Sequence, residues 1–238
     1  MGADSRARAR AERYAGWRTV ARGGREFEAP RRRLAERLAA NGIRSRRVLD
    51  AFATVPRHLL VPETLSGDAY RNVSLPIGDG QTISAPGTVA QMTEALELDA
   101  GETVLEVGTG SGYQAAILSR LVARVISIER VPRLAASART ALDRLGVSNV
   151  VVHLGDGTAG RPADAPFDAI VVTAGGPEIP RPLVDQLADG GRLVGPFGAR
   201  GQQELVRIRR QPGGDLTREV LGPCRFVDLL GTHGWTAG

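Results

Sequence analysis

The chain contains no lysine and a single cysteine, Cys224, among its 238 residues. One cysteine excludes an internal disulfide and any metal site built on clustered thiolates. The three histidines share no ligand spacing, so we expect no metal. No apolar run reaches the roughly 20 residues that a membrane-spanning helix needs, and no apolar signal-peptide core follows the N-terminus. We therefore expect a cytoplasmic protein without membrane segments.

Because lysine is absent, all 31 basic residues are arginines, and they gather at the N-terminus. Residues 1–47 contain 14 arginines against 5 acids, about +9, so the remainder of the chain carries about −4 of the net +5. Such an arm could contact nucleic acid or an anionic surface, or it could be a solvated tail before a surface helix. Since no cluster of aromatic side chains accompanies the arginines, nucleic acid is not the partner that we expect.

Three segments are expected along the chain. Residues 1–29 show no sustained periodicity and predict a basic, flexible arm. Residues 30–230 form one domain, and residues 231–238 a C-terminal tail. The domain opens with a helix from Pro30, in which Leu34 and Leu38 are spaced four apart before the stop signal Asn41-Gly42. A second short helix is expected over residues 46–53.

From Thr103 onward, strand and helix patterns alternate. Continuous apolar strands are predicted over residues 103–107, 124–129, 150–154, 168–173 and 192–197, with a helix over residues 180–191 before the last. Two final strands, over 202–210 and 219–230, are joined by a connection too short for a parallel crossover. We therefore predict a doubly wound, mostly parallel seven-stranded α/β sheet with antiparallel C-terminal strands, preceded by a helical N-terminal segment.

The stretch VLEVGTGSGYQAAIL places glycines between a predicted strand and a predicted helix. Gly108, Gly110 and Gly112 form G-x-G-x-G, whereas the dinucleotide fingerprint is G-x-G-x-x-G. Such glycines let the backbone approach a ligand and leave amide groups free at the start of a helix. The same pattern also occurs at tight turns that bind nothing.

Three acids lie at the carboxyl ends of predicted strands: Glu106 and Glu129 within the ends of the first two, and Asp156 just after the third. A doubly wound sheet binds its ligand at that edge. Glu106, two residues before Gly108, would repel a pyrophosphate but suits a cofactor with an ammonium and a sulfonium group. Glu129 lies about 20 residues further on, where an acid can hydrogen-bond ribose hydroxyls. These acids favour S-adenosylmethionine over NAD.

Longer motifs carry a resemblance that covers residues 31–230. VPRHLLVPE, AYRNVSLPIG, LPIGDGQTISAP, the glycine loop, GDG and APFDAIVVTAGGPEIPRPLVDQLADGGRLVGPFG are similar to the bacterial protein-L-isoaspartate (D-aspartate) O-methyltransferases. The resemblance implies the class I methyltransferase-like Rossmann fold, with S-adenosylmethionine as cofactor. It also implies methylation of the α-carboxyl group of isoaspartyl residues in damaged proteins. The methyl ester would then cyclise to a succinimide and reopen partly to aspartate. The expected partners are isoaspartyl proteins and peptides, and the expected state is a monomer.

The resemblance also implies roles for individual residues. It makes Ser84 the active-site serine, although a serine before Pro86 would equally suit a helix N-cap. Substrate binding falls to Gln81, Ile83 and Val227, the last within the segment Cys224–Leu230. Cofactor binding falls to Thr82, Glu106, Gly108, Gly110, Gly112, Glu129, Arg130, Asp156 and Gly157.

The chain departs from the family pattern at a few positions. Gly87 stands where some relatives have histidine, Gly175-Gly176 replace an alanine-rich stretch, and Asp228 stands where proline is common. These departures leave other substrates open: an aspartate in a modified peptide, or nucleic acid bound by the arginine-rich arm. A binding module without activity and a nicotinamide reductase are further alternatives.

Overall fold

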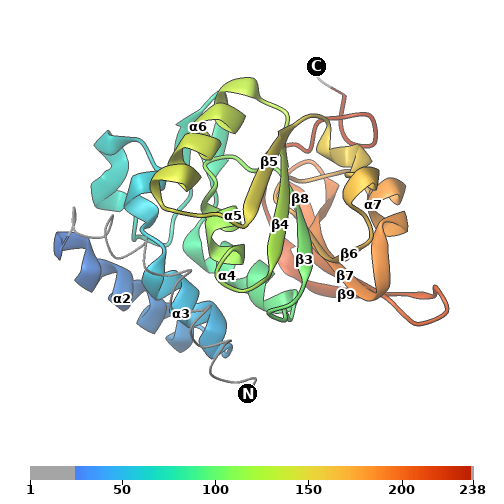
Figure 1. Ribbon diagram of the computed structural model, residues 1–238, viewed down its shortest axis with the longest axis horizontal. Helices are drawn as coiled ribbons and strands as arrows, with labels where there is room; N and C mark the ends of the chain where they lie inside the picture. Colours follow the sequence, from blue (N-terminus) through green and yellow to red (C-terminus); the bar gives the residue numbers. More distant parts are fainter. Residues whose placement is uncertain (1–24, 237–238) are drawn as a thin grey trace.

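The computed structural model describes residues 25–236 of the chain (Figure 1). Its main sheet has seven strands in the order β5-β4-β3-β6-β7-β8-β9, and β1 and β2 form a separate hairpin. The strands are β1 (Leu75–Gly78), β2 (Gln81–Ile83), β3 (Thr103–Val107), β4 (Arg124–Glu129), β5 (Val150–Leu154), β6 (Phe167–Val172), β7 (Leu187–Ala199), β8 (Gln202–Arg210) and β9 (Leu216–Cys224). The helices are α2 (Arg25–Ala40), α3 (Arg46–Thr54), α4 (Pro86–Ala95), α5 (Tyr113–Leu118), α6 (Pro132–Arg144) and α7 (Arg181–Asp185).

The predicted fold class is confirmed. Strands β5, β4, β3, β6 and β7 pair in parallel, and β8 and β9 continue the sheet antiparallel. The chain winds outward from β3 in one direction to β5 and in the other to β9, so the order reverses between β3 and β6. The carboxyl ends of strands at such a reversal form the crevice in which doubly wound sheets bind ligands.

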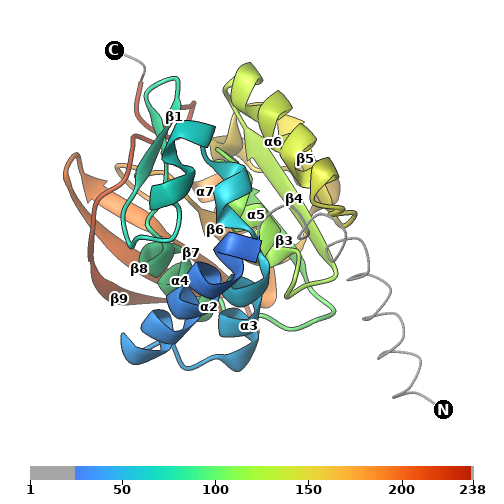
Figure 2. The same ribbon diagram turned by 90° about the vertical axis from the view of Figure 1, so that its left-hand side faces the viewer.

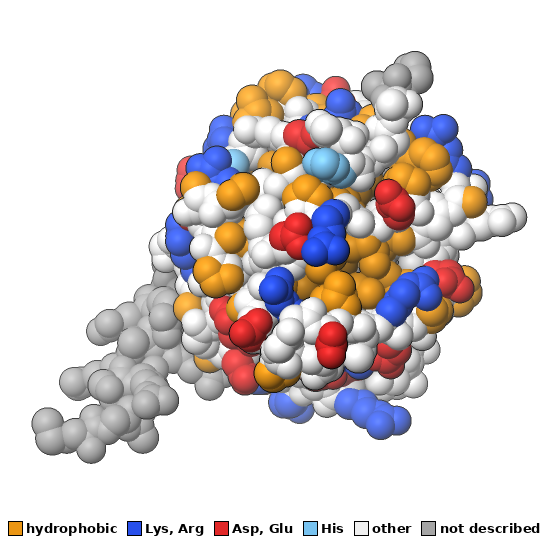
Figure 3. Space-filling view, turned by 90° about the vertical axis from the view of Figure 1, so that its right-hand side faces the viewer, with side chains coloured by type: hydrophobic (Ala, Val, Ile, Leu, Met, Phe, Trp, Pro, Cys, Tyr) orange, Lys and Arg blue, Asp and Glu red, His pale blue; other side chains and the backbone are white. Residues whose placement is uncertain are grey.

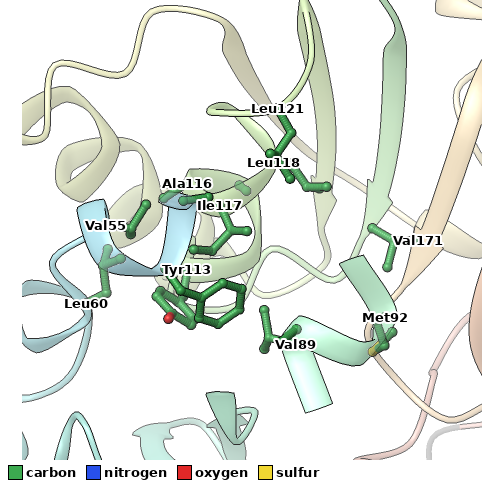
Figure 4. Close-up of a cluster of buried hydrophobic side chains, with 14 of the residues drawn as sticks. Val55, Leu60, Val89, Met92, Tyr113, Ala116, Ile117, Leu118, Leu121 and Val171 are labelled. Atoms are coloured by element: carbon green, nitrogen blue, oxygen red, sulfur yellow. The ribbon is translucent and has the colours of Figure 1, made fainter. Parts of the chain in front are cut away.

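Helices cover both faces of the sheet, which explains the continuous apolar strands. In β3, Val104 joins the core under α4 and α5, whereas Leu105 and Val107 join the core under α7, because successive side chains of a strand point to opposite faces. Figure 4 shows part of the first core, where Val89 and Met92 of α4 meet Tyr113 and neighbouring residues of α5.

The N-terminal helices belong to this core. Figure 2 shows α2 and α3 on the side of the molecule where α4 and α5 lie. Arg57 is fully buried and its guanidinium lies 4.7 Å from the ring centroid of Tyr113 at the start of α5. Within the described residues, α2 already includes the five residues before the expected start at Pro30, and the Phe27 ring among them stacks on His58 at 4.1 Å. The expected flexibility of residues 1–24 lies outside the described residues.

Two predicted elements near the C-terminus are wrong in extent. The helix expected over residues 180–191 ends at Asp185, because Leu187 already pairs with Phe167 in the sheet and Gly190 has a φ of +76°. The last strand ends at Cys224 rather than Leu230. The segment after Cys224 then lies across the carboxyl ends of the parallel strands. Hydrogen bonds of Thr232, His233 and Trp235 dock the first part of the expected tail, up to Trp235.

Candidate active site at the carboxyl ends of the strands

A cleft of about 620 Å³ lies where the order of the strands reverses. The loops after β3, β4, β5 and β6 form its floor, and the β1–β2 hairpin and the C-terminal segment form its walls. Predicted residues gather here from distant parts of the sequence: Gln81, Thr82, Gly108, Gly110, Glu129, Arg130, Gly157 and Val227.

The glycine loop needs its glycines for two different reasons. Gly108, Gly110 and Gly112 have φ values of +97°, +54° and +83°, a region that residues with a Cβ rarely adopt. A Cβ on Gly108 would also lie 2.4 Å from Thr173 Oγ1. Gly112 instead caps α5 in the left-handed conformation and does not line the cleft. The predicted roles of Gly108 and Gly110 therefore fit the geometry better than that of Gly112.

Thr173, directly after β6, is a site residue that the sequence reasoning missed. Its hydroxyl lies 2.6 Å from the carbonyl oxygen of Gly108 and 2.9 Å from that of Val107, so it ties the glycine loop to the neighbouring strand. Its side chain also lines the cleft. Two signals were available: Thr173 ends the strand predicted over residues 168–173, and it lies inside the motif APFDAIVVTAGGPEIP.

Glu129 ends β4 inside the cleft and is 6% exposed. Its carboxylate accepts hydrogen bonds from the backbone N–H groups of Gly110 at 2.8 Å and Val131 at 2.9 Å. These bonds fix the loop against the end of the second parallel strand. Each carboxylate oxygen has lone pairs to spare, so Glu129 can still accept hydrogen bonds from ribose hydroxyls, as its position in the sequence predicts.

Glu106 does not face the cleft, contrary to the expectation from its position. Its side chain is fully buried beneath the loop, where it accepts a hydrogen bond from Ser127 on the adjacent strand. The Ser127 hydroxyl is in turn 2.5 Å from that of Thr109. Burial, helped by the charge of Glu129 and opposed by the bond from Ser127, raises the pKa of Glu106 to about 8. The carboxyl group therefore supports the loop from behind in its protonated form at neutral pH.

Replacing Glu106 by glutamine is expected to alter how stability depends on pH. Because the pKa of Glu106 is raised in the folded state, its contribution to the free energy of unfolding is complete below pH 4.5. That contribution is lost as the pH rises towards 8. Relative to E106Q, the wild type should lose up to about 1.4 kcal/mol per pH unit across this window. Urea unfolding of both proteins without cofactor at pH 5, 6, 7 and 8 would measure the difference. Parallel stability curves would contradict the buried protonated carboxyl group.

Asp156 also serves a different purpose from the expected one. Its carboxylate accepts hydrogen bonds from the Thr158 backbone at 2.9 Å, the Thr158 hydroxyl at 2.6 Å and the Thr232 backbone at 2.7 Å. Burial raises the pKa of Asp156, but these hydrogen bonds outweigh it and hold the pKa below its usual value. Asp156 thus anchors the C-terminal segment, while the adjacent Gly157 lines the cleft; a Cβ there would lie 2.6 Å from Val107 Cγ1.

The C-terminal segment that carries Val227 is fixed to the loop after β6. The Gly175 N–H donates to the Val227 carbonyl at 2.7 Å, and the Leu229 N–H donates to the Gly175 carbonyl at 2.8 Å. A Cβ on Gly175 would lie 2.7 Å from the Gln203 amide nitrogen, so glycine suits this close approach. Asp228, which also lines the cleft, pairs with Arg200 at 2.7 Å. The glycine and aspartate that depart from the family pattern are therefore integrated in the wall of the cleft.

Ser84 lies in a second cavity of about 400 Å³ that adjoins the first. Ile83 lines this second cavity as well, and four residues line both: Thr82, Gly108, Gly110 and Thr173. Ser84 does not cap α4, because the N-cap residue is Ala85 and no side chain bonds there. Within residues 25–236 its hydroxyl has no hydrogen-bond partner. The capping alternative is therefore wrong, and a free hydroxyl stands beside the glycine loop.

No group of three or more His, Cys, Asp or Glu side chains between residues 25 and 236 could hold a metal ion. No helix in the same range is long and apolar enough to cross a membrane.

Comparisons with known proteins agree with this geometry. The family model described as protein-L-isoaspartate(D-aspartate) O-methyltransferase (PCMT) matches residues 29–234. A protein-L-isoaspartate O-methyltransferase of Geobacter metallireducens is 52% identical over 88% of this chain and 97% of its own length. That of Syntrophobacter fumaroxidans is 55% identical over 88% and 98%.

Solved structures agree as well. A protein-L-isoaspartate O-methyltransferase superposes with a TM-score of 0.78 at 31% identity, over 86% of this chain and 67% of the other. A Plasmodium falciparum protein, described as a protein-L-isoaspartate O-methyltransferase in complex with S-adenosyl-L-homocysteine, gives 0.74 at 27% identity, over 84% and 98%. The chain therefore belongs to the protein-L-isoaspartate (D-aspartate) O-methyltransferase family.

Proposed function

We propose that this chain transfers a methyl group from S-adenosylmethionine to the α-carboxyl group of L-isoaspartyl residues in damaged proteins, the step that starts their repair through a succinimide. The observation that carries the proposal is the free hydroxyl of Ser84 in a cavity that shares its wall with the glycine-loop cleft. Membership of the family supplies the substrate class.

The residues of the cleft fit this cofactor. The backbones of Gly108, Gly110 and Gly157 line the cleft, and glycine lets a flat nucleoside approach the backbone closely. A side chain on Gly108 or Gly157 would collide with Thr173 or Val107 and disturb this lining. Glu129 offers carboxylate oxygens for ribose hydroxyls. When bound, S-adenosylmethionine supplies an electrophilic methyl group on a sulfonium. We propose that Thr82, Gly108, Gly110, Glu129, Arg130 and Gly157 contact it, with Glu106 and Asp156 holding the loop and the C-terminal segment in place.

The chemistry demands orientation rather than a base. An isoaspartyl α-carboxyl group is already ionised at neutral pH, so no proton has to be removed before it attacks. Ser84 can donate one hydrogen bond to a carboxylate oxygen and align the other oxygen for in-line attack. Gln81, Ile83 and Val227 surround the two cavities from the hairpin and the C-terminal segment. We propose that they position the peptide that carries the carboxylate.

Some expectations remain predictions. An aspartate in a modified peptide is the alternative substrate that the departures at Gly87, Gly175 and Asp228 leave open. The arginine-rich arm, on which a nucleic-acid substrate would depend, falls largely in residues 1–24, outside the described part. That the protein is a monomer and acts in the cytoplasm also stays a prediction.

The test is methyl transfer from labelled S-adenosylmethionine to two peptides that differ at one residue, isoaspartate in one and aspartate in the other. We expect base-labile label on the isoaspartyl peptide alone, because the two carboxyl groups differ in their position along the backbone. Label on the aspartyl peptide would move the assignment to peptide modification. Label on neither peptide, with the cofactor bound, would overturn the proposed function.

A further inference from the structure

A basic groove lies outside both cavities, along helix α2; Figure 2 shows this helix on the side that faces the viewer. Helix α2 forms one wall, and the loop after the 3-10 helix Glu63–Asp68 forms the other. Three arginines and no acid line it: Pro30, Arg33, Arg37, Gly67, Tyr70, Arg71 and Asn72.

The positive charge of this groove is poorly neutralised. Within residues 25–236, Arg33 is exposed and makes no ion pair, and Arg37 donates to the Tyr70 carbonyl oxygen at 2.7 Å rather than to a carboxylate. Arg71 pairs with Asp68 at 3.0 Å, but both side chains are largely exposed, and such pairs contribute little. Figure 3 shows the opposite side of the molecule, where acidic and basic side chains are interspersed. The groove is therefore a local site of attraction for anionic groups.

One residue that lines the groove contacts the segment that follows the proposed active-site serine. The Asn72 side chain, at one end of the groove, accepts a hydrogen bond from the Gly87 N–H at 2.7 Å in the first turn of α4. Gly87 lies three residues after Ser84. A Cβ on Gly87 would be 2.9 Å from the Asn72 amide oxygen, so the glycine that departs from the family pattern permits this contact. We infer from this contact that a peptide with its carboxylate at Ser84 can reach the groove with its neighbouring residues.

We propose that this groove binds acidic residues next to the isoaspartate, so that the enzyme prefers damaged sites in acidic segments of proteins. The inference rests on the proposed function, since the peptide would be anchored at Ser84. An acidic peptide fits better than single-stranded nucleic acid, which needs exposed rings for its bases. Tyr70, the aromatic residue that lines the groove, is 6% exposed, and its hydroxyl is hydrogen-bonded to His58.

Three isoaspartyl peptides test the preference: one with neutral flanks, one with glutamates before the isoaspartate and one with glutamates after it. We expect one of the two acidic peptides to have a KM about fivefold below that of the neutral peptide, a magnitude typical of two exposed charge pairs. The double variant R33Q/R71Q should abolish that difference and leave kcat and the KM of the neutral peptide unchanged. The matched control R32Q/R46Q removes two exposed arginines of α2 and α3 that do not line the groove, and it should retain the preference.

The outcomes separate this inference from the proposed function. Equal KM values for all three peptides would overturn the proposal that the groove binds acidic residues, while the proposed function would stand. If no peptide is methylated, the proposed function fails, and anisotropy with fluorescent acidic and neutral peptides then decides on the groove. Equal affinity of the protein for the acidic and the neutral peptide would overturn the proposed groove. A loss of the acidic preference in R32Q/R46Q as large as that in R33Q/R71Q would overturn it as well. Arg33- and Arg71-dependent binding of oligouridylate without binding of the acidic peptide would make the groove a nucleic-acid site instead.

Discussion

Replacing Ser84 by alanine is expected to lower kcat/KM for an isoaspartyl peptide about 100-fold, the size of effect seen when one positioning donor is removed from an active site. The Kd of S-adenosylmethionine should stay close to that of the wild type, because Ser84 lines the second cavity and not the cleft of Glu129. Single-turnover methyl transfer and calorimetric titration of the cofactor would measure the two effects.

If Ser84 had a purely structural role, its variants would differ from the wild type in Tm as well as in kcat. Since Ser84 neither caps α4 nor bonds any described residue, S84A should unfold at the wild-type Tm. S84T, which keeps a hydroxyl, should recover part of the lost kcat. If S84A methylated the peptide as fast as the wild type, Ser84 would not be the orienting residue.

The parallel part of the fold was predictable because strands that are buried on both faces of a sheet have continuous apolar sequences. Strand β3 and strand β8 have the predicted bounds, and the hairpin between β8 and β9 followed from a connection too short for a crossover. The predictions failed where distant contacts decide. Phe27, before the expected start of α2, stacks on His58, and the pairing of Leu187 with Phe167 ends α7 early. Neither contact has a local pattern.

The sequence predicted where the site lies in the fold, but it did not predict the contacts that its residues make. The positions of Glu106, Glu129 and Asp156 at the ends of strands identified the correct edge of the sheet, but Glu129 alone of the three lines the cleft. Strand alternation puts Glu106 on the face under α5, as it does Val104. Asp156 holds Thr232, whose position could not be anticipated, since residues 225–236 lack regular structure. Thr173 was missed because its role depends on the loop it ties down.

The glycine loop offers the second large effect: G108A is expected to raise the Kd of S-adenosylmethionine about 100-fold, or about 2.8 kcal/mol, because the added methyl group displaces the loop that lines the cleft. An alanine at a φ of +97° is strained by roughly 1–2 kcal/mol. Its Cβ would also lie 2.4 Å from Thr173 Oγ1, so the Thr173 hydroxyl would have to move away. Without that hydroxyl, the Gly108 carbonyl loses its tie to β6 and the loop moves.

Alanine variants of two further glycines should give smaller increases in the Kd of the cofactor, or none. A Cβ on Gly101 would meet no atom within 4 Å, and Gly101 has no positive φ, so G101A should bind the cofactor like the wild type. Gly110 has a φ of +54°, close to the left-handed region that alanine can enter, and its Cβ would lie 3.4 Å from Ile77 Cδ1. G110A should therefore fall between G101A and G108A. Calorimetric titration of the three variants would establish the order, and cofactor binding by G108A at wild-type strength would show that close backbone approach at Gly108 is not what the cleft requires.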